Sequence, residues 1–579
     1  AVFVPLSWVY VKRASLIESI QKQFDPSSAG VLIASMLGDQ YFLDRETADI
    51  FREGGTFHVL VISGLHITFI GGLILLLARQ FTRRRKLQAI VAVASLWLYG
   101  IAVGGEPPVL RACVMFTVLM SGYVFYRTSS LLNALGASAL VLLVWRPSDL
   151  FDPSFQLTFL SMTAIVAFGL PLVEKVKAIG TWTPTSARPF PPNVPNWLRR
   201  FCETMYWREA AWNIERDRQI WSARLIKTPY SGRLDEVGIR RIITFIFEGL
   251  IISIAVQIWL FPLLVYYFHR VSVASILLNL WVGAVLTAES IAALVTVTLG
   301  SLTSILAIPF KTLTEVLNWL LVSVPSVITD SHWTSFRVPI YSGPFRLIYF
   351  LYFVPVIIAS WLMVRWDPFT VQKRKQTLGG VVAALLIVML SSVILLHPFS
   401  VKAPDGKLHV DFLDVGQGDA ALITFPNGET MLVDGGGRQS YNDEAETEFE
   451  PDVPRIGESV VSEVLWERGL SRIDHIVATH ADADHIQGLV DVSKNFSIGS
   501  GYFGVLQADP DLNQLLSVWN QKQVPTTRVA SGDRFNIGGV WIEVLNPPLG
   551  TMNSVSANNG SVVLRVIFGE TEILLTGDI

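Results

Sequence analysis

The chain has 579 residues, of which 51% are hydrophobic and only 16% charged, and its mean hydropathy is +0.45. Soluble domains carry about 25% charged residues, so this composition excludes an ordinary soluble protein and places most of the chain in lipid. The net charge of −3 gives no overall basic signal for nucleic acid, although a neutral total still leaves room for a local basic patch. Two cysteines, Cys113 and Cys202, are too few for a disulfide framework.

Several apolar runs approach the roughly 20 residues that a helix needs to cross a bilayer. They are 58–78, 88–103, 109–126, 131–145, 157–173, 242–265, 273–299, 303–322, 346–364 and 377–396. Two of them are short, and a tilted or re-entrant path would accommodate them. The sequence therefore predicts a polytopic α-helical membrane domain with about ten spans.

Basic residues gather in four connections between these runs, and such residues mark the cytoplasmic side of a membrane. The connections are Arg83–Lys86, Arg127, the insert 174–241 and Gln372–Lys375. With ten spans, all four fall on one side, and everything after about residue 397 falls on the other. We expect the insert to be a solvated cytoplasmic loop, with a contact to nucleic acid or to a partner protein as the alternative.

Beyond residue 405 the pattern changes from long apolar runs to short alternating segments, which are typical of strands. Strands are predicted within 407–415, 421–437, 471–480, 539–547, 561–569 and 570–578, and a helix at 486–496. The second of these segments contains the turn Asn427-Gly428, so we expect it to form a hairpin. Strands mixed with helices indicate a separate α/β domain.

Side chains of the types that bind metals follow the strand that ends at His480. In an extended segment His480 and Asp482 face the same way, which suits one metal, whereas the adjacent Asp484 and His485 diverge and suit a second. Asp578, at the end of a later strand, is the expected bridging carboxylate. The pattern predicts a dinuclear hydrolytic centre that binds two divalent cations. Manganese or zinc is expected, with magnesium as a further candidate, because the carboxylate at 482 makes the site harder.

The alternative interpretation of this cluster is a polar loop between strand and helix, in which Asp482 or Asp484 caps the helix. For His475, inside the preceding strand, we expect ordinary packing.

The stretch Thr479–Gly488 (THADADHIQG) resembles the metal signature of the metallo-β-lactamase fold, in the form where aspartate replaces the second histidine. Asp414–Ile423 and Met431–Gly437 resemble the opening hairpin of that fold. The resemblance implies an αββα domain, incomplete at its C-terminal end, with Asp484 and His485 in the catalytic centre. It also implies that Asp434 is a buried aspartate that orients the site. Many members carry a further histidine ligand in a region occupied here by other residues: Asn558, Asn559 and Ser561.

Polar residues also occur inside or beside the apolar runs, where they should face protein or water because their exposure to lipid is costly. Together they suggest a polar path through the bundle, and the alternative is that each one braces neighbouring helices. The candidate channel residues are Ser63, His66, Glu106, Arg111, Gln156, His269 and Arg270.

Taken together, these motifs resemble the ComEC family of DNA internalisation proteins of naturally transformable bacteria. The stretches that carry the resemblance are SGLH (63–66), GEPPVLRA (105–112), FDPSFQL (151–157), HRVSV (269–273), DVGQGDA (414–420) and HADADH (480–485). The family implies a multi-pass protein of the bacterial inner membrane that passes single-stranded DNA. Its extracytoplasmic lactamase-like domain would act on duplex DNA as a metal-dependent nuclease and degrade the other strand. Membrane lipid, a DNA receptor, a cytoplasmic translocase and a second copy of the chain are the expected partners.

The resemblance also sets the expected domain boundaries. Residues 1–50 would be the tail of a missing N-terminal OB-like domain, 51–397 the transmembrane channel and 405–579 the lactamase-like domain. Two other functions stay open at this point. One is a transporter or scaffold with an inactive lactamase-like domain, and the other is a membrane-bound metallohydrolase of a small substrate.

Overall fold

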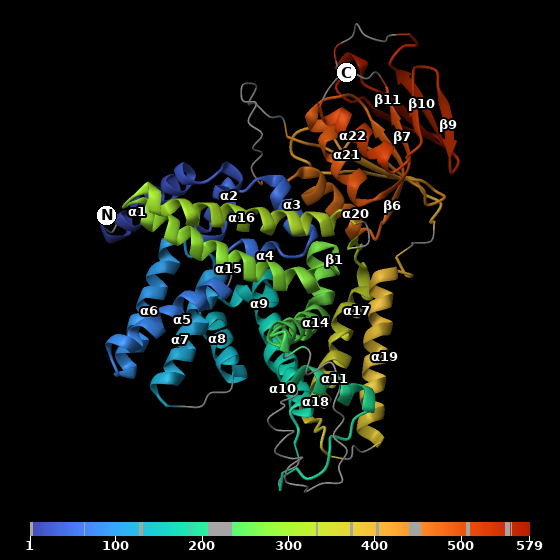
Figure 1. Cartoon of the computed structure of the whole chain (residues 1–579). Helices are drawn as coiled ribbons and strands as arrows, with labels where there is room; N and C mark the ends of the chain where they lie inside the picture. Colours follow the sequence, from blue (N-terminus) through green and yellow to red (C-terminus); the bar gives the residue numbers. More distant parts are fainter. Residues whose placement is uncertain are drawn as a thin grey trace.

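The computed structural model combines a helical domain with a C-terminal domain of strands and helices (Figure 1). The residues that it describes are 4–579 without 63, 127–130, 184, 187, 207–233, 235, 332–333, 371–373, 401–403, 439–451, 453, 505–509, 551–555 and 557. Ser63, one of the candidate channel residues, and most of the basic insert lie outside the described residues.

The first three helices pack onto the helical domain. They are α1 (Val4–Gln23), α2 (Pro26–Leu37) and α3 (Arg45–Glu53). Asp44 caps α3, since its carboxylate accepts a hydrogen bond from the Thr47 N–H at 3.3 Å. Phe51 of α3 and Val31 of α2 share an apolar cluster with Leu286 and Leu321. The segment 4–53 is thus mostly helical, and α2 and α3 pack against α15 (Ser275–Gly300) and α16 (Ser304–Thr329).

The remaining helices of the domain follow in chain order. They are α4 (Phe57–Leu60), α5 (Gly64–Phe81), α6 (Arg85–Ala102), α7 (Pro107–Val124), α8 (Leu131–Trp145), α9 (Pro153–Ala164), α10 (Leu170–Gly180), α11 (Asn196–Tyr206), α14 (Arg240–Phe268), α15 (Ser275–Gly300), α16 (Ser304–Thr329), α17 (Leu347–Leu351), α18 (Phe353–Arg365) and α19 (Arg374–Leu396). A π-helical segment, Ile165–Gly169, joins α9 to α10.

Seven described helical segments are long and apolar enough to cross a membrane. They are Pro107–Val124, Pro153–Gly180, Arg240–Phe268, Ser275–Gly300, Ser304–Thr329, Gly343–Arg365 and Thr377–Leu396. The three other expected spans are present as α5, α6 and α8, which are shorter or less apolar. Helices α15 and α16 pack against each other and lie crosswise to α5–α8 and α19 in Figure 1.

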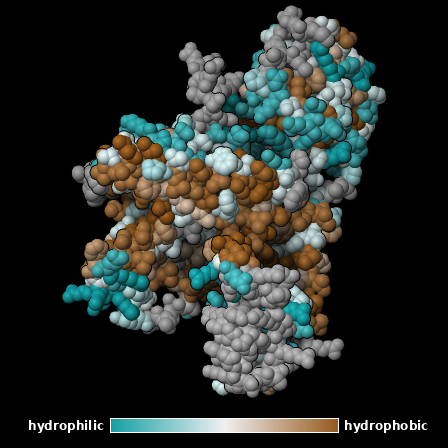
Figure 2. Space-filling view, viewed as in Figure 1, coloured by the Kyte–Doolittle hydropathy of each residue, from teal (hydrophilic) through white to brown (hydrophobic). Residues whose placement is uncertain are grey.

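The helical domain has two unlike ends. The C-terminal domain stands beyond one end, whereas α5, α10 and α18 run to the opposite end before the chain turns back (Figure 1). Three of the predicted basic connections follow these helices. Figure 2 shows hydrophobic side chains over the middle of the molecule and hydrophilic ones over the C-terminal domain and near the far tips. This distribution suits a membrane domain with a water-exposed domain on one side.

Two sheets build the C-terminal domain. The first has the order β3-β4-β5-β6-β7-β8, with β3 (His409–Phe412), β4 (Ala421–Thr424), β5 (Thr430–Val433), β6 (Arg472–Ala478), β7 (Ser497–Phe503) and β8 (Thr526–Arg528). The second has the order β12-β11-β10-β9, with β9 (Arg534–Ile537), β10 (Val540–Asn546), β11 (Val563–Phe568) and β12 (Thr571–Leu575). From β5 to β8 neighbouring strands are parallel, and all other pairs in the two sheets are antiparallel.

Side chains that alternate along the strands of the first sheet pack into two apolar cores, one on each face of the sheet. Met431 and Val433 of β5 point into the core between the sheets, where they meet residues such as Ile542 and Val566. Leu432 points to the other face, where it packs under helices that include α21 (Ala483–Asn495) and α22 (Pro510–Gln521). The described layers are thus helix, sheet and sheet. The second helical layer of the expected αββα arrangement is not among the described residues.

Candidate metal centre

The expected metal-binding side chains lie at strand ends that the fold brings together. Asp434 directly follows β5, and Thr479 and His480 directly follow the parallel neighbour β6. Asp578 follows β12 of the other sheet, and His485 lies in the first turn of α21. Because parallel strands end at the same edge of a sheet, residues far apart in the sequence converge there.

Asp434 is held in a conformation that side chains rarely adopt. Its φ is 57°, in the left-handed region, and its side chain is almost fully buried. One carboxylate oxygen accepts hydrogen bonds from the Thr479 hydroxyl at 2.6 Å and from His485 Nδ1 at 2.9 Å, and the other accepts from the Thr479 N–H at 2.9 Å. A strained backbone that is so completely tied down is typical of functional sites.

This network sets the proton positions on both histidines. His485 Nδ1 donates to Asp434, so in the neutral ring the lone pair lies on Nε2. The Thr479 hydroxyl donates to Asp434 and therefore accepts from His480 Nδ1 at 2.9 Å, which leaves the lone pair of His480 on Nε2 as well. Asp434 thus orients one ring directly and the other through Thr479, as carboxylates behind metal-ligating histidines do.

The metal-binding atoms of the two histidines converge with the Asp578 carboxylate. Ligand atoms of His480, His485 and Asp578 all lie within 4.8 Å of one another. His485 Nε2 is 3.2 Å from Asp578 Oδ1, and His480 Nε2 is 3.4 Å from Asp482 Oδ2. His480 Nε2 is buried, yet among the described residues it has no hydrogen-bond partner. An orphaned imidazole nitrogen beside carboxylates is the donor set that a divalent cation requires, so these residues fit a metal.

The roles of the two motif aspartates differ. Asp482 stands at the N-cap position of α21, but its side chain makes no capping hydrogen bond within the described structure and lies beside His480 instead. Asp484 lies in the first turn of α21, and its charge acts on His485. The interpretation of Asp482 as a simple helix cap is therefore not supported.

Acidic neighbours change the protonation of His485. Burial lowers the pKa of this imidazole, but the hydrogen bond and charge of Asp434, together with Asp578 and Asp484, raise it to about 9. A cation that binds Nε2 must therefore displace a proton near neutral pH, so its affinity should increase as the pH rises.

Glycines allow the loops of the centre to approach each other closely. A Cβ on Gly418 would collide with the Asp484 carbonyl, and one on Gly437 with the Ala483 carbonyl. Gly418 has a φ of 81° in addition, a conformation that favours glycine. The DVGQGDA and DGGG stretches therefore pack directly against the N-terminal turn of α21.

Of the three residues in the region where many members carry a further histidine ligand, Ser561 is the buried one. Ser561 is fully buried, and its hydroxyl finds no partner in the part of the chain that the structure describes. Ser561 lies against Gly577, next to Asp578, whereas Asn558 and Asn559 are exposed. Asn546, which the sequence did not suggest, donates to the Ser561 carbonyl at 2.8 Å and fixes this segment.

The described candidate channel residues of α5, α7 and α9 have individual contacts or positions in the helical domain. Arg111 is buried, 3.4 Å from Asp152 Oδ2, and bonds to the Ser154 hydroxyl, so it ties α7 to the start of α9. The side-chain amide oxygen of Gln156 accepts a hydrogen bond from the Tyr267 hydroxyl at 2.9 Å. Glu106 precedes α7 as its N-cap residue, and His66 lies in the first turn of α5.

His269 and Arg270 contact the C-terminal domain. His269 Nε2 is 3.1 Å from Glu463 Oε1, and Arg270 Nη2 is 3.3 Å from Glu458 Oε1, both in the C-terminal domain. These two residues therefore belong to the contact between the domains.

Known families match both parts of this architecture. Residues 35–366 match the competence protein family, and residues 413–579 match the metallo-beta-lactamase superfamily. The chain belongs to the competence protein family. The lactamase match covers His480, His485 and Asp578 and accounts for the two stacked sheets.

Two curated relatives match nearly the whole chain. ComE operon protein 3 of Bacillus subtilis (strain 168) is 25% identical over 98% of this chain and 62% of its own length. Recombination protein 2 of Haemophilus influenzae (strain ATCC 51907 / DSM 11121 / KW20 / Rd) is 26% identical over 98% of this chain and 63% of its own length. The chain thus spans slightly less than two thirds of these relatives.

Proposed function

We propose that this chain takes up DNA across the bacterial inner membrane, passing a single strand while its lactamase-like domain degrades the other strand. The convergence of His480, His485 and Asp578 on one point, in a domain attached to apolar helices, carries this proposal. The match to the competence protein family and the relative named for recombination support a role with DNA.

Divalent cations, when bound at such a site, polarise a phosphoryl oxygen and make water nucleophilic near neutral pH. Within this chain, His480 and His485 would hold them through Nε2, and Asp482, Asp484 and Asp578 through carboxylate oxygens. We assign Asp578 as the ligand shared by two cations. The oxygen-rich set favours manganese, with zinc as the competing metal and magnesium as a further candidate.

The basic connections support an orientation in the membrane. Three of them follow helices that run to the end of the helical domain away from the metal centre (Figure 1). Basic loops stay in the cytoplasm, so the metal centre would lie outside the inner membrane. A nuclease there meets duplex DNA before transport and removes one strand as the other enters. A cysteine in place of the exposed Asn513 should react with an impermeant maleimide in intact spheroplasts, and protection until lysis would contradict this orientation.

The activity can be tested with the full chain in detergent, linear duplex DNA and Mn²⁺. We expect cleavage by the wild type and by His409→Ala, a matched exposed histidine in the same domain, and none by His485→Ala. Equal cleavage by His485→Ala would contradict the proposal. Metal binding without any hydrolysis would indicate an inactive scaffold. Hydrolysis of bis(p-nitrophenyl) phosphate but not of DNA would indicate an enzyme for small substrates.

A further inference from the structure

A two-stranded antiparallel sheet at the end of α14 carries an unfavourable charge pair. Its strands, β1 (Arg270–Ser272) and β2 (Ser335–Arg337), are separated in the chain by α15 and α16 and place Arg270 directly opposite Arg337. Like charges in directly opposed positions destabilise such a strand pair. Glu458 of the C-terminal domain resolves this conflict, because its Oε1 lies 3.3 Å from Arg270 Nη2 and 3.2 Å from Arg337 Nη2. The strand pair of one domain is thus completed by a carboxylate of the other.

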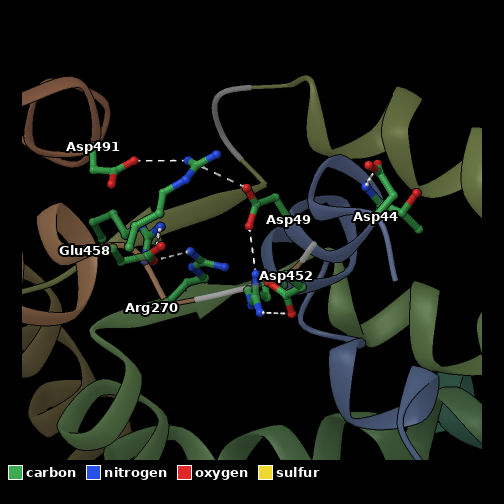
Figure 3. A network of polar contacts seen from close by, with 10 residues as sticks. Asp44, Asp49, Arg270, Asp452, Glu458 and Asp491 are labelled. Atoms are coloured by element: carbon green, nitrogen blue, oxygen red, sulfur yellow. Dashed lines mark hydrogen bonds and ion pairs between the residues drawn. The ribbon is translucent and has the colours of Figure 1, made fainter. Parts of the chain in front are cut away.

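A second group of charges joins α3 to the C-terminal domain (Figure 3). Arg52 Nη2 lies 2.5 Å from Asp452 Oδ2, across 400 residues of sequence. Arg455 Nη1 lies 3.0 Å from Asp491 Oδ1 of α21 and 3.9 Å from Asp49 Oδ2 of α3. The side chains of Asp452 and Asp491 are only 5% and 6% exposed, so water screens these pairs less than it screens surface ion pairs.

Apolar and backbone contacts accompany the charges. The His269 ring stacks on Trp466, with centroids 4.7 Å apart, and the Ile340 N–H donates to the Trp466 carbonyl at 3.2 Å. His269 is 1% exposed, so this part of the contact is dry. Charge, stacking and backbone contacts therefore act on the same face of the C-terminal domain.

This face directly supports the metal-ligand helix. The π-helical segment Gly457–Ser462, which carries Glu458, lies so close to α21 that a Cβ on Gly457 would collide with Gly488. A Cβ on Gly488 would in turn collide with the carbonyl of Gly435, next to Asp434. Glycine contacts of this kind leave little room for the layers to slide.

We propose that Glu458, bound by Arg270 and Arg337, together with the Asp49–Arg455–Asp491 bridge, forms a docking latch that fixes α21 and the metal centre over the helical domain. The latch sets where the centre stands relative to the membrane helices, and it does not depend on the substrate that the centre hydrolyses. The participating residues are positioning residues, because they are joined to the metal centre only through α21 and its glycine contacts.

The distance between spin labels on the full chain in nanodiscs tests the latch. Labels at Ser15→Cys in α1 and Gln514→Cys in α22 are exposed, whereas the native Cys113 and Cys202 are buried. We expect one narrow distance distribution for the otherwise unchanged chain. Glu458→Arg would place three cations together and should broaden the distribution. Combining Glu458→Arg with Arg270→Glu and Arg337→Glu should narrow it again.

Two controls separate docking from misfolding. Glu572→Arg reverses a charge of an exposed pair with Arg565 in the same domain and should leave the distribution narrow. The pair Arg270→Glu and Arg337→Glu changes only the helical domain and should broaden the distribution while Mn²⁺ binding persists. An unchanged narrow distribution in Glu458→Arg, or failure of the triple reversal to narrow it, would overturn the proposal.

Discussion

The metal centre and the helical domain both contain buried polar residues, but they use them differently. In the metal centre, one carboxylate orients two histidines, and the remaining nitrogen of His480 has no hydrogen-bond partner within the described structure. In the helical domain, Arg111 and Gln156 each make contacts with a neighbouring helix or loop. Convergence of several metal-binding side chains on a shared point indicates chemistry, whereas contacts of single residues with a neighbouring segment indicate architecture.

The largest effect should follow from removal of a converging ligand. His480→Ala deletes the orphaned Nε2, and we expect DNA cleavage to fall by more than about 100-fold, beyond the range for residues that only orient a ligand. Cleavage kinetics at saturating Mn²⁺ measure this effect. Activity within twofold of the wild type would show that convergence in the metal centre does not mark catalytic residues, and the contrast with the helical domain would be lost.

Loss of the orienting carboxylate should have an intermediate effect. Asp434→Asn keeps the shape of the side chain but weakens its hold on both imidazoles, and metal affinity should fall by about 10–100-fold. Competition titration with a fluorescent chelator measures the affinity. A normal affinity would mean that the histidines are oriented by packing alone.

A contact inside the helical domain should affect stability more than metal chemistry. Arg111→Ala removes the hydrogen bonds that the guanidinium makes to Asp152 and Ser154 at the start of α9. Hydrogen bonds of a charged group are worth about 1.5–3 kcal/mol. We expect a lower melting temperature in detergent with unchanged Mn²⁺ affinity. If DNA transport is lost while the melting temperature is retained, Arg111 belongs to the conducting path instead.

The smallest effect concerns pH at the contact between the domains. Burial raises the pKa of Asp491 to about 6, although Arg455 lowers it, and Glu458 raises it further. Since this folded-state pKa lies above the ordinary value of 3.8, the proton on Asp491 contributes stability below about pH 3.8, and this contribution is lost as the pH rises through about 6.

Asp491→Asn should therefore flatten the change in melting temperature between pH 4 and pH 7. A shift of a few degrees is expected for one carboxyl group in a domain of this size. Equal pH profiles for the variant and the wild type would show that Asp491 does not titrate in this range.

The lactamase-like domain was readable from the sequence because its signals are local. The predicted segments contain β3–β6 and β10–β12, and the predicted helix is part of α21. The His-x-Asp-x-Asp-His spacing lies directly after β6, so strand periodicity alone located it. Strands β7, β8 and β9 were missed, since β7 contains Gly499 and Gly501 and β8 and β9 have only three and four residues. Gly501 is required by packing, as a Cβ there would meet the Trp519 ring.

Contacts between distant segments were not readable. The pairing of Arg52 with Asp452 joins residues 400 positions apart, and no periodic pattern links them. His269 and Arg270 looked like channel residues because they follow a long apolar helix, and only the fold shows that the C-terminal domain binds them. A charge near a span predicts that a partner exists, but it does not identify the partner.

Direct binding of Mn²⁺ to the full chain tests the central claim of this account. Electron paramagnetic resonance of free Mn²⁺ during a titration gives the number of bound ions and their affinity. We predict saturable binding by the wild type and by His409→Ala, and loss of that binding in His485→Ala. Binding by His485→Ala that equals the wild type would show that the converging residues are not a metal centre.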